Sequence, residues 1–428
     1  MEMKTLLKNA KILKMTDENI IEGHILVDGN RIAYIGKELP AGDFDKVIDC
    51  EGNLLMPGFK DAHTHSAMTF LRSKADDSSL HDWLFDEIFP REENLRKGHV
   101  RELTKVAILE YLTSGITGVV DQYFYPEEFE QTCVDFGFRC LNLAMYDRTV
   151  RPVSDIKKLL TANEKKDYLV RYVLGLHSEY TPDEDMFETT KKLLEETKLP
   201  FYVHLSETSN EVKECIARRG CTPMEFFDSM HYFDHGGAIF HGVYLTDHDI
   251  ELIKKRDVVL VTNPSSNMKL ASGVAEITKL LKAGVTIALG TDGPASNNAL
   301  DMFREMYLVT GLQKLITKNP VSIPAFEVLK MATVNGAKAM RLDDGDVLEV
   351  GKLADIIMID LSRPSMQPIN SIINNLVYAG EKDVVKMTMI NGKMLYLDNK
   401  FYVGEDIKDI YAKVQKMTEE LSVIKKQI

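Results

Sequence analysis

Cysteine is scarce in this sequence and is never arranged in pairs. The five cysteines are an odd number, are scattered along the chain and form no C-x-x-C motif. The sequence therefore indicates neither a disulfide framework nor a cysteine-based zinc site. Positive charge is also in short supply, with 52 Lys and Arg against 65 Asp and Glu and a net charge of −13. This balance argues against nucleic acid and anionic membrane surfaces as partners.

Long apolar runs are missing as well. The first 15 residues are interrupted by four lysines and hold no apolar stretch of signal-peptide length. No later run approaches about 18 apolar residues, the length that a membrane-spanning helix needs. We therefore expect a cytoplasmic protein. Its 428 residues could hold a barrel of about 250 residues together with a smaller domain.

Eight short apolar runs alternate with helical patterns in the middle of the chain. The runs are 57–62, 116–120, 138–144, 169–176, 200–205, 238–240, 258–261 and 285–289, and examples of the helical patterns are 101–112, 182–198 and 273–283. Buried parallel strands are continuously apolar, and their alternation with helices is typical of parallel α/β folds. The pattern therefore predicts an α/β protein with a distorted (β/α)8 TIM barrel.

Strand-like segments also occur at both ends of the chain, at 5–12, 23–27, 31–35, 353–361, 384–390 and 393–397. We expect them to combine into one small β-sandwich, followed by an amphipathic closing helix at 406–426. The predicted domains are 1–56 for the first part of the sandwich, 57–345 for the barrel and 346–428 for the second part with the helix.

Histidine or aspartate stands at the carboxyl end of six of the eight predicted strands: His63 and His65, Asp121, His177, His204, His241 and Asp292. Each of these alone has an ordinary explanation, such as a capping aspartate or a core histidine. The carboxyl ends of the strands of a (β/α)8 barrel meet on one face, however, which is where active sites lie. The set as a whole therefore indicates an active site.

Four of these residues form a candidate metal site. His63 and His65 point to the same side of their strand, because side chains alternate along a strand. With His204 and Asp292 they supply three imidazoles and one carboxylate, which suits one Zn²⁺ or Fe²⁺ with a position left open for water. Such an ion brings the pKa of its water to about 7, and Asp292 could accept the proton of that water.

Two further residues are candidate catalytic groups. Glu207 follows His204 by three residues and could reach a substrate nitrogen; the alternative is a carboxylate in the first turn of the next helix. His241 could orient or polarise the attacking water; the alternative is a histidine that only hydrogen-bonds behind the site.

With these residues assembled, the sequence resembles the amidohydrolase superfamily, and within it the 5'-methylthioadenosine/S-adenosylhomocysteine deaminases. The resemblance rests on motifs spread over nearly the whole chain: Pro57-Gly58-Phe59 into His63-Thr64-His65, Met68 to Arg72, Asp82-Trp83-Leu84, His204 to Thr208, Asn263 to Leu270, and Thr291-Asp292-Gly293 to Ser296-Asn297-Asn298. It implies a small-molecule purine nucleoside as substrate, hydrolysed at its 6-amino group to the inosine analogue and ammonia. It also implies one metal per subunit, because His177 stands where binuclear relatives carry a carboxylated lysine.

The same resemblance implies individual roles. Glu207 would protonate N1 of the purine, and Asp292 would relay a proton to the departing ammonia. His177 would contact the substrate, Glu92 would bind the ribose hydroxyls, and Trp83 would lie near the nucleoside, although it could equally be a packing residue. Ala144 stands where some relatives use an arginine for the homocysteine carboxylate, with Arg148 and Arg151 as the nearby candidates. We also expect a homo-oligomer.

Two other functions fit part of this pattern. One is hydrolysis of another heterocycle on the same metal site, such as s-triazine dechlorination, because fold and metal do not determine the substrate. The other is a non-catalytic scaffold, which would be expected to have lost metal ligands. A role of Glu92 in binding a ribose diol would distinguish a nucleoside deaminase from the first alternative. The measured metal content would distinguish an enzyme from the second alternative.

Overall fold

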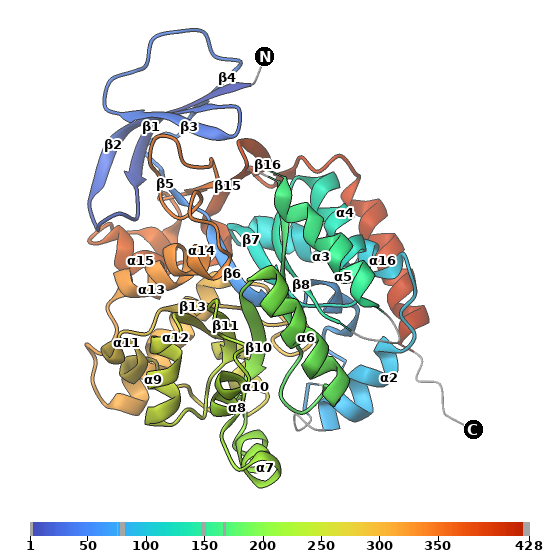
Figure 1. Cartoon of the computed structure of the whole chain (residues 1–428). Helices are drawn as coiled ribbons and strands as arrows, with labels where there is room; N and C mark the ends of the chain where they lie inside the picture. The colour runs from blue at the N-terminus through green and yellow to red at the C-terminus, as the bar shows by residue number, and fades with distance from the viewer. Residues whose placement is uncertain (1–2, 75, 78–81, 147–150, 166–167, 423–428) are drawn as a thin grey trace.

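The middle of the chain forms a nearly closed barrel, and the two ends of the chain build a second sheet beside it (Figure 1). The computed structural model describes residues 3–74, 76–77, 82–146, 151–165 and 168–422. The eight barrel strands follow one another in chain order: β6 (Phe59–Thr64), β7 (Ile116–Asp121), β8 (Arg139–Ala144), β9 (Val170–Gly175), β10 (Phe201–Leu205), β11 (Gly237–His241), β12 (Val258–Thr262) and β13 (Ile287–Leu289). The predicted barrel is confirmed.

The barrel strands are almost completely buried, as their continuous apolar runs predict. Neighbouring strands pair in parallel from β6 to β13. At the closing edge, β13 contacts β6, and the backbone N–H of Asp292 donates to the carbonyl of His63 at 2.9 Å. The last strand therefore brings the loop after it directly against the carboxyl end of the first.

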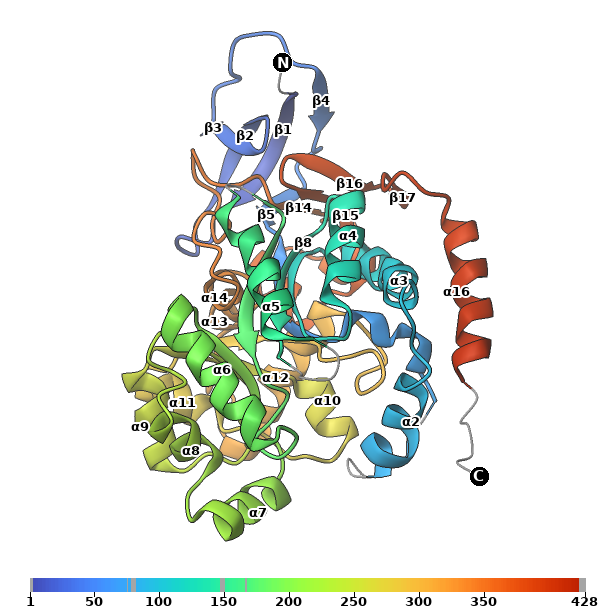
Figure 2. The same cartoon turned by 45° about the vertical axis from the view of Figure 1, so that its right-hand side comes forward.

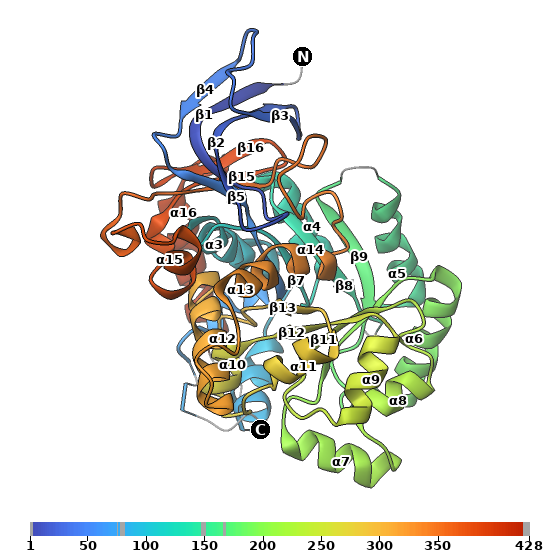
Figure 3. The same ribbon diagram turned by 90° about the vertical axis from the view of Figure 1, so that its left-hand side faces the viewer.

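Helices cover the outside of the barrel (Figures 1 and 3). Those that follow the barrel strands are α3 (His99–Thr113), α4 (Pro126–Phe136), α5 (Val153–Leu160), α6 (Glu184–Thr197), α7 (Ser209–Arg219), α8 (Pro223–Ser229), α9 (Asp247–Lys255), α10 (Pro264–Lys269), α11 (Ile277–Ala283), α12 (Met302–Thr317), α13 (Ala325–Ala332) and α14 (Val334–Ala339). After β6 come the short 3-10 helix η1 (Ser66–Leu71), a π-helix, η2 (Trp83–Ile88), and α2 (Phe89–Glu92). Within the described residues, no helix has both the length and the apolarity needed to cross a membrane.

The strands from both chain ends join in one nine-stranded sheet. It consists of β1 (Lys4–Leu13), β2 (Ile20–Asp28), β3 (Arg31–Gly36), β4 (Lys46–Asp49), β5 (Leu54–Pro57), β14 (Ile356–Ile359), β15 (Val385–Ile390), β16 (Lys393–Leu397) and β17 (Lys400–Phe401). Apolar side chains of the first strands and of β14 and β15 share one buried cluster, separate from the barrel core. The expected association of the two ends is therefore present, and β4, β5 and β17 are strands that the sequence pattern did not reveal.

The chain passes from this sheet into the barrel at Pro57 and Gly58. The pattern placed the first barrel strand at 57–62, but β6 begins at Phe59, because Pro57 still pairs with Ile356 of β14. A side chain at position 58 would meet the Thr117 side chain at 2.0 Å, so only glycine fits between the two sheets.

A buried ion cluster ties the terminal sheet to the base of the barrel. Arg139 of β8 donates two hydrogen bonds to Asp355, at 2.7 and 3.0 Å, and both side chains are almost fully buried. Lys60 lies 3.9 Å from the same carboxylate. Burial alone would raise the pKa of Asp355, but the charges of Arg139 and Lys60 hold it below its usual range.

Two further helices belong to the last part of the chain: α15 (Ile372–Tyr378) lies between β14 and β15, and α16 (Ile407–Leu421) follows β17. Helix α16 runs along the side of the molecule against α3 (Figure 2). The predicted closing helix is therefore present, and the end of its predicted range, 423–426, lies outside the described residues. An ion pair between Lys413 and Glu102 joins the two helices at 2.9 Å.

Candidate active site

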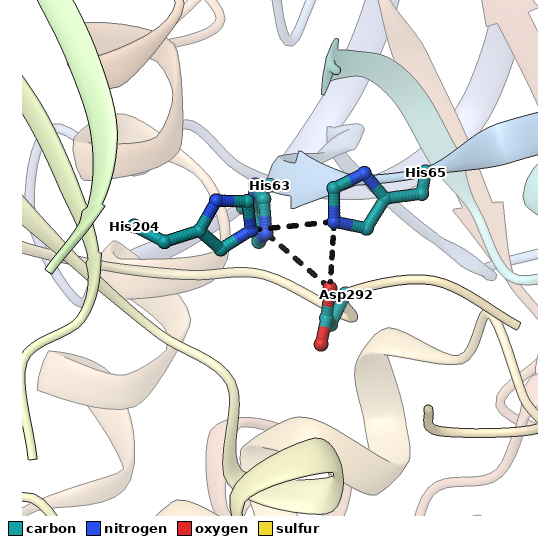
Figure 4. Close-up of side chains that lie close together, drawn as sticks. All are labelled: His63, His65, His204 and Asp292. Atoms are coloured by element: carbon teal, nitrogen blue, oxygen red, sulfur yellow. Dashed lines mark hydrogen bonds and ion pairs between the residues drawn. The ribbon is translucent and has the colours of Figure 1, made fainter. Parts of the chain in front are cut away.

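The four candidate metal ligands converge at the carboxyl end of the barrel. His63 lies on β6 and His65 directly follows it, His204 lies on β10, and Asp292 lies in the loop after β13. One donor atom from each side chain lies within 4.8 Å of the others (Figure 4). The carboxylate oxygen Oδ1 of Asp292 is 3.3 Å from Nε2 of His63 and 3.1 Å from Nε2 of His65. Strand order thus brings together residues that are more than 200 positions apart.

The chemistry of this donor set fits a metal ion. Nδ1–H of His65 donates to the carbonyl of Gln122 at 2.6 Å, and Nδ1–H of His204 donates to the carbonyl of His177 at 2.7 Å. Both rings therefore turn the lone pair of Nε2 to the centre, where the two Nε2 atoms face each other at 3.3 Å. Backbone bonds to the outer nitrogen are the usual way in which metal-binding histidines are oriented.

His63 supports the same conclusion. Its ring is fully buried, and neither ring nitrogen has a hydrogen-bond partner among the described residues. A buried imidazole without partners is costly unless something else binds it. Burial would raise the pKa of Asp292, but the rings of His63 and His65 beside it hold that pKa well below its usual range, so the carboxylate is charged.

Glu207 lies beside this centre at the start of α7. Thr208 caps that helix, and Glu211, one turn into it, accepts hydrogen bonds from the backbone N–H groups of Ser206 and Glu207, both at 2.7 Å. The side chain of Glu207 is buried and turns to the pocket instead of capping the helix. Burial raises its pKa, which is the property expected of a group that must hold a proton near neutral pH.

His241 ends β11 with its backbone in the left-handed region, at a φ of 71°. Its ring is buried, and Nε2 lies 3.8 Å from Oε2 of Glu207. On the other side, Nδ1 lies 2.8 Å from the amide oxygen of Asn267. The ring thus faces the site with one nitrogen and is held from behind by the other.

A single pocket contains these groups and the predicted substrate residues. It is lined by His65, Met68, Trp83, Leu84, Phe89, Glu92, Gln122, Tyr123, Phe124, Met145, His177, Tyr180, His204, Glu207, His241, Leu270 and Asp292. Apolar and aromatic side chains make up much of the wall, and the ionisable groups gather on one part of it, a distribution typical of small-molecule sites.

The predicted substrate residues differ in their surroundings. Glu92 is buried at the end of α2 and accepts a hydrogen bond from the hydroxyl of Tyr123 at 2.6 Å. Burial raises the pKa of Glu92 to about 7. Burial lowers the pKa of His177 to about 4, so this ring is neutral. Trp83 lines the pocket, and its Nε1 has no hydrogen-bond partner within the described part of the chain.

Of the two candidate arginines, only Arg151 lies in the described part of the chain, and it is not among the residues that line the pocket. Ala144 is buried in β8, Arg151 lies 3.6 Å from Glu127, and Arg148 is outside the described residues. Among the described residues that line the pocket, none is Lys or Arg.

Several residues that touch the catalytic groups were not assigned a role from the sequence. Ser266 and Ser296 donate to Asp292, Ser272 donates to Glu207, and Asn267 binds His241. Three of the four lie within or just after the motif Asn263 to Leu270, which the sequence offered as a resemblance without a function. The sequence signal that could have identified these residues was the cluster of small polar residues that follows strand β12.

Comparisons with known proteins agree with this geometry. The model of the amidohydrolase family matches residues 54–395. A 5-methylthioadenosine/S-adenosylhomocysteine deaminase of Thermococcus sibiricus is 40% identical over 92% of this chain and 94% of its own. A 5'-deoxyadenosine deaminase of Methanothermobacter thermautotrophicus is 37% identical over 90% and 92% of the two chains. The crystal structure of an adenosine deaminase from Xanthomonas campestris with bound zinc superposes with a TM-score of 0.90 at 29% identity, covering 98% and 99%.

Proposed function

Since the chain belongs to the amidohydrolase family, we propose that it is a metal-dependent deaminase that hydrolyses the 6-amino group of an adenosine-type nucleoside. The observation that supports this most strongly is the composition of one pocket. His65, His204 and Asp292 of the His-His-His-Asp cluster line it together with two buried carboxyl groups, those of Glu207 and Glu92. The curated relatives that act on such nucleosides match nearly the whole chain.

We propose that His63, His65, His204 and Asp292 hold one Zn²⁺ per subunit, with Fe²⁺ as the alternative. An ion bound there would lower the pKa of a water molecule to about 7 and so make it nucleophilic at neutral pH. Zinc is favoured by the zinc-containing deaminase of similar structure and by the imidazole-rich donor set.

The reaction replaces the amino group at C6 by oxygen and releases ammonia. Water adds to C6 while Glu207 donates a proton to N1 of the purine, which its raised pKa favours. Asp292 would accept one proton of the water and pass it to the leaving nitrogen, and the remaining hydroxyl proton at C6 would return to Glu207 as ammonia departs. His241 would hydrogen-bond to the attacking water through Nε2.

The remaining pocket residues bind the nucleoside. We propose that Glu92 accepts hydrogen bonds from the ribose hydroxyls, with Tyr123 holding one oxygen of the carboxylate in place. His177 contacts the substrate, and Trp83 packs beside it. The described wall has no cationic side chain to pair with a homocysteine carboxylate, so 5'-methylthioadenosine, 5'-deoxyadenosine and adenosine are favoured over S-adenosylhomocysteine.

A substrate panel tests this proposal. Purified protein should release ammonia from the three favoured nucleosides, followed by the absorbance change from adenine to hypoxanthine. S-adenosylhomocysteine should show a lower kcat/KM, and adenine itself and an s-triazine should be poor substrates. Turnover of a heterocycle without ribose, with none of the nucleosides, would contradict the proposal. Less than about one tightly bound metal ion per chain would revive the non-catalytic alternative.

Two further parts of the proposal concern the protein as a whole. We propose that the protein is a homo-oligomer, which light scattering of the purified protein can test. A measured mass equal to that of one chain would contradict this proposal. We also propose a cytoplasmic location, tested by cell fractionation with a soluble marker enzyme as the control.

A further inference from the structure

One segment that carries none of the proposed catalytic groups contacts three of them. This segment, residues 263–272, follows β12 and contains the short helix α10. We call it the support segment. Its side chains at 265, 266 and 267 are buried, whereas Met268 is 47% exposed, so the helix turns one polar face inward. Buried polar side chains need partners, and the partners of Ser266 and Asn267 belong to the active site.

The support segment is itself held firmly in place. The backbone N–H of Ser265 donates to Oε2 of Glu305 on α12 at 2.9 Å, and Glu305 is fully buried. At the far end, the N–H of Ser272 donates back to the carbonyl of Asn267 at 2.9 Å. Ala271, between them, adopts a left-handed φ of 53°, which turns the chain. The polar side chains are therefore presented from a rigid base.

Asn267 contacts His241. Its amide oxygen lies 2.8 Å from Nδ1 of the ring, and the amide nitrogen of Asn263 lies at 3.3 Å. The shorter contact is to an acceptor, so it selects the ring form with hydrogen on Nδ1 and leaves the lone pair on Nε2. That is the nitrogen that faces Glu207 and the pocket.

Ser266 contacts Asp292. Its hydroxyl donates to Oδ2 of Asp292 at 2.6 Å, and Ser296 donates to the same oxygen at 2.8 Å. The other oxygen, Oδ1, is the one that faces the histidines. The two hydroxyls thus determine which carboxylate oxygen is directed to the metal centre.

Ser272 contacts Glu207. Its hydroxyl donates to Oε1 of Glu207 at 3.0 Å, while Oε2 is the oxygen nearer to His241. A carboxylate held by one oxygen has a single orientation, which a proton transfer over hydrogen-bond distance requires.

From these contacts we infer that the support segment is the positioning element of the site: Asn267, Ser266 and Ser272 set the orientation of His241, Asp292 and Glu207 respectively. This inference rests on the proposed function for its kinetic consequences. None of the three residues touches the substrate in this role; each acts through the group that it holds. Contacts of this kind, behind the groups that react, typically account for about 10- to 100-fold in activity or metal affinity.

The test compares alanine variants with one matched control. Asn267→Ala and Ser272→Ala should each lower kcat about 10- to 100-fold, with KM and the affinity for the inosine-type product little changed. The control is Ser265→Ala, a neighbouring buried serine that lies beside Glu305 and makes no hydrogen bond to His241, Asp292 or Glu207. It should keep wild-type kcat.

Conservative variants separate positioning from a structural role. Asn267→Asp keeps an acceptor oxygen at the same place, and Ser272→Thr keeps a hydroxyl. Both variants should therefore have a kcat much closer to the wild-type value than the alanine variants have. If they do not, or if the alanine variants match the control, the inference is wrong. Folding of every variant is followed by its melting temperature.

A measurement that needs no turnover keeps the inference separate from the proposed function. Ser266→Ala should weaken zinc affinity in a chelator competition by about 10-fold, and Ser265→Ala should not. If the wild-type protein binds zinc but deaminates no nucleoside, the proposed function fails while this comparison still decides the inference. Equal zinc affinity of the two variants would overturn the assignment of Ser266.

Discussion

Replacing Glu207 by glutamine tests the centre of the proposed mechanism. The change Glu207→Gln keeps the size of the side chain and the oxygen that accepts from Ser272, but the amide cannot donate and recover a proton. General acid–base catalysis typically contributes about 10²- to 10⁴-fold. We therefore expect kcat to fall by this factor, which corresponds to about 3–5 kcal/mol in the activation free energy.

The structure also predicts what this variant should retain. Glu207 is buried and its pKa is raised, so folding already disfavours its charged form. Removing the charge should therefore leave the melting temperature unchanged or slightly higher. Metal content should stay at the wild-type value, because Glu207 is not one of the four proposed ligands. Binding of an inosine-type product should also persist.

The assay measures kcat from the adenine-to-hypoxanthine absorbance change at saturating substrate. Metal content and product binding are measured on the same preparation. Glu214→Gln is the matched control, because Glu214 lies on the same helix with a 56% exposed side chain and pairs with Arg218. The control should have wild-type kcat. Unchanged kcat in Glu207→Gln would refute the role of Glu207, and loss of metal together with kcat would show that the carboxylate serves the metal site instead.

Three other predictions follow from the same structure. Burial raises the pKa of Glu92 to about 7, so its carboxylate is charged above that pH and protonated below it, and KM for adenosine should fall as pH rises through about 7. The control substrate 2',3'-dideoxyadenosine lacks the diol, so its KM should not depend on pH in this way. Equal pH profiles of KM for the two substrates would contradict the role of Glu92 in binding ribose. Dialysis against a strong chelator should abolish turnover and added Zn²⁺ should restore it, whereas full activity of metal-free protein would contradict the assignment of the four ligands. Asp355→Ala removes one partner of a buried ion pair and should lower the free energy of unfolding by about 3–5 kcal/mol in a urea titration. The exposed pair of Arg31 and Asp344 is its control, for which Asp344→Ala should cost about 0–1 kcal/mol, and equal losses would contradict the argument from burial.

The domain limits and the roles of individual site residues stay predictions. The structure brings His63, His65, His204 and Asp292 together, and Glu92, His177, Glu207 and Trp83 line one pocket with the last three of these. What each residue does there is left to the variants described above.

The sequence by itself determined the barrel and the face on which its polar residues gather. Buried parallel strands must be apolar along their whole length, so their positions could be identified within one or two residues at most ends, as for 116–120 and β7. Because the carboxyl ends of such strands meet, a histidine or aspartate at six of the eight strand ends was sufficient to predict their convergence. The association of the two chain ends could be predicted from the strand-like segments at both ends, and β14 does pair with β5.

Only the tertiary structure decided how the catalytic groups are held. The contacts of Asn267 with His241, of Ser272 with Glu207 and of Tyr123 with Glu92 join segments at the ends of different barrel strands. No local pattern encodes such contacts, because the local sequence around a small polar residue looks the same whether its side chain faces solvent or a buried carboxylate. The start of β6 at Phe59 was likewise decided by the pairing of Pro57 with a strand 300 residues away, which no local propensity records.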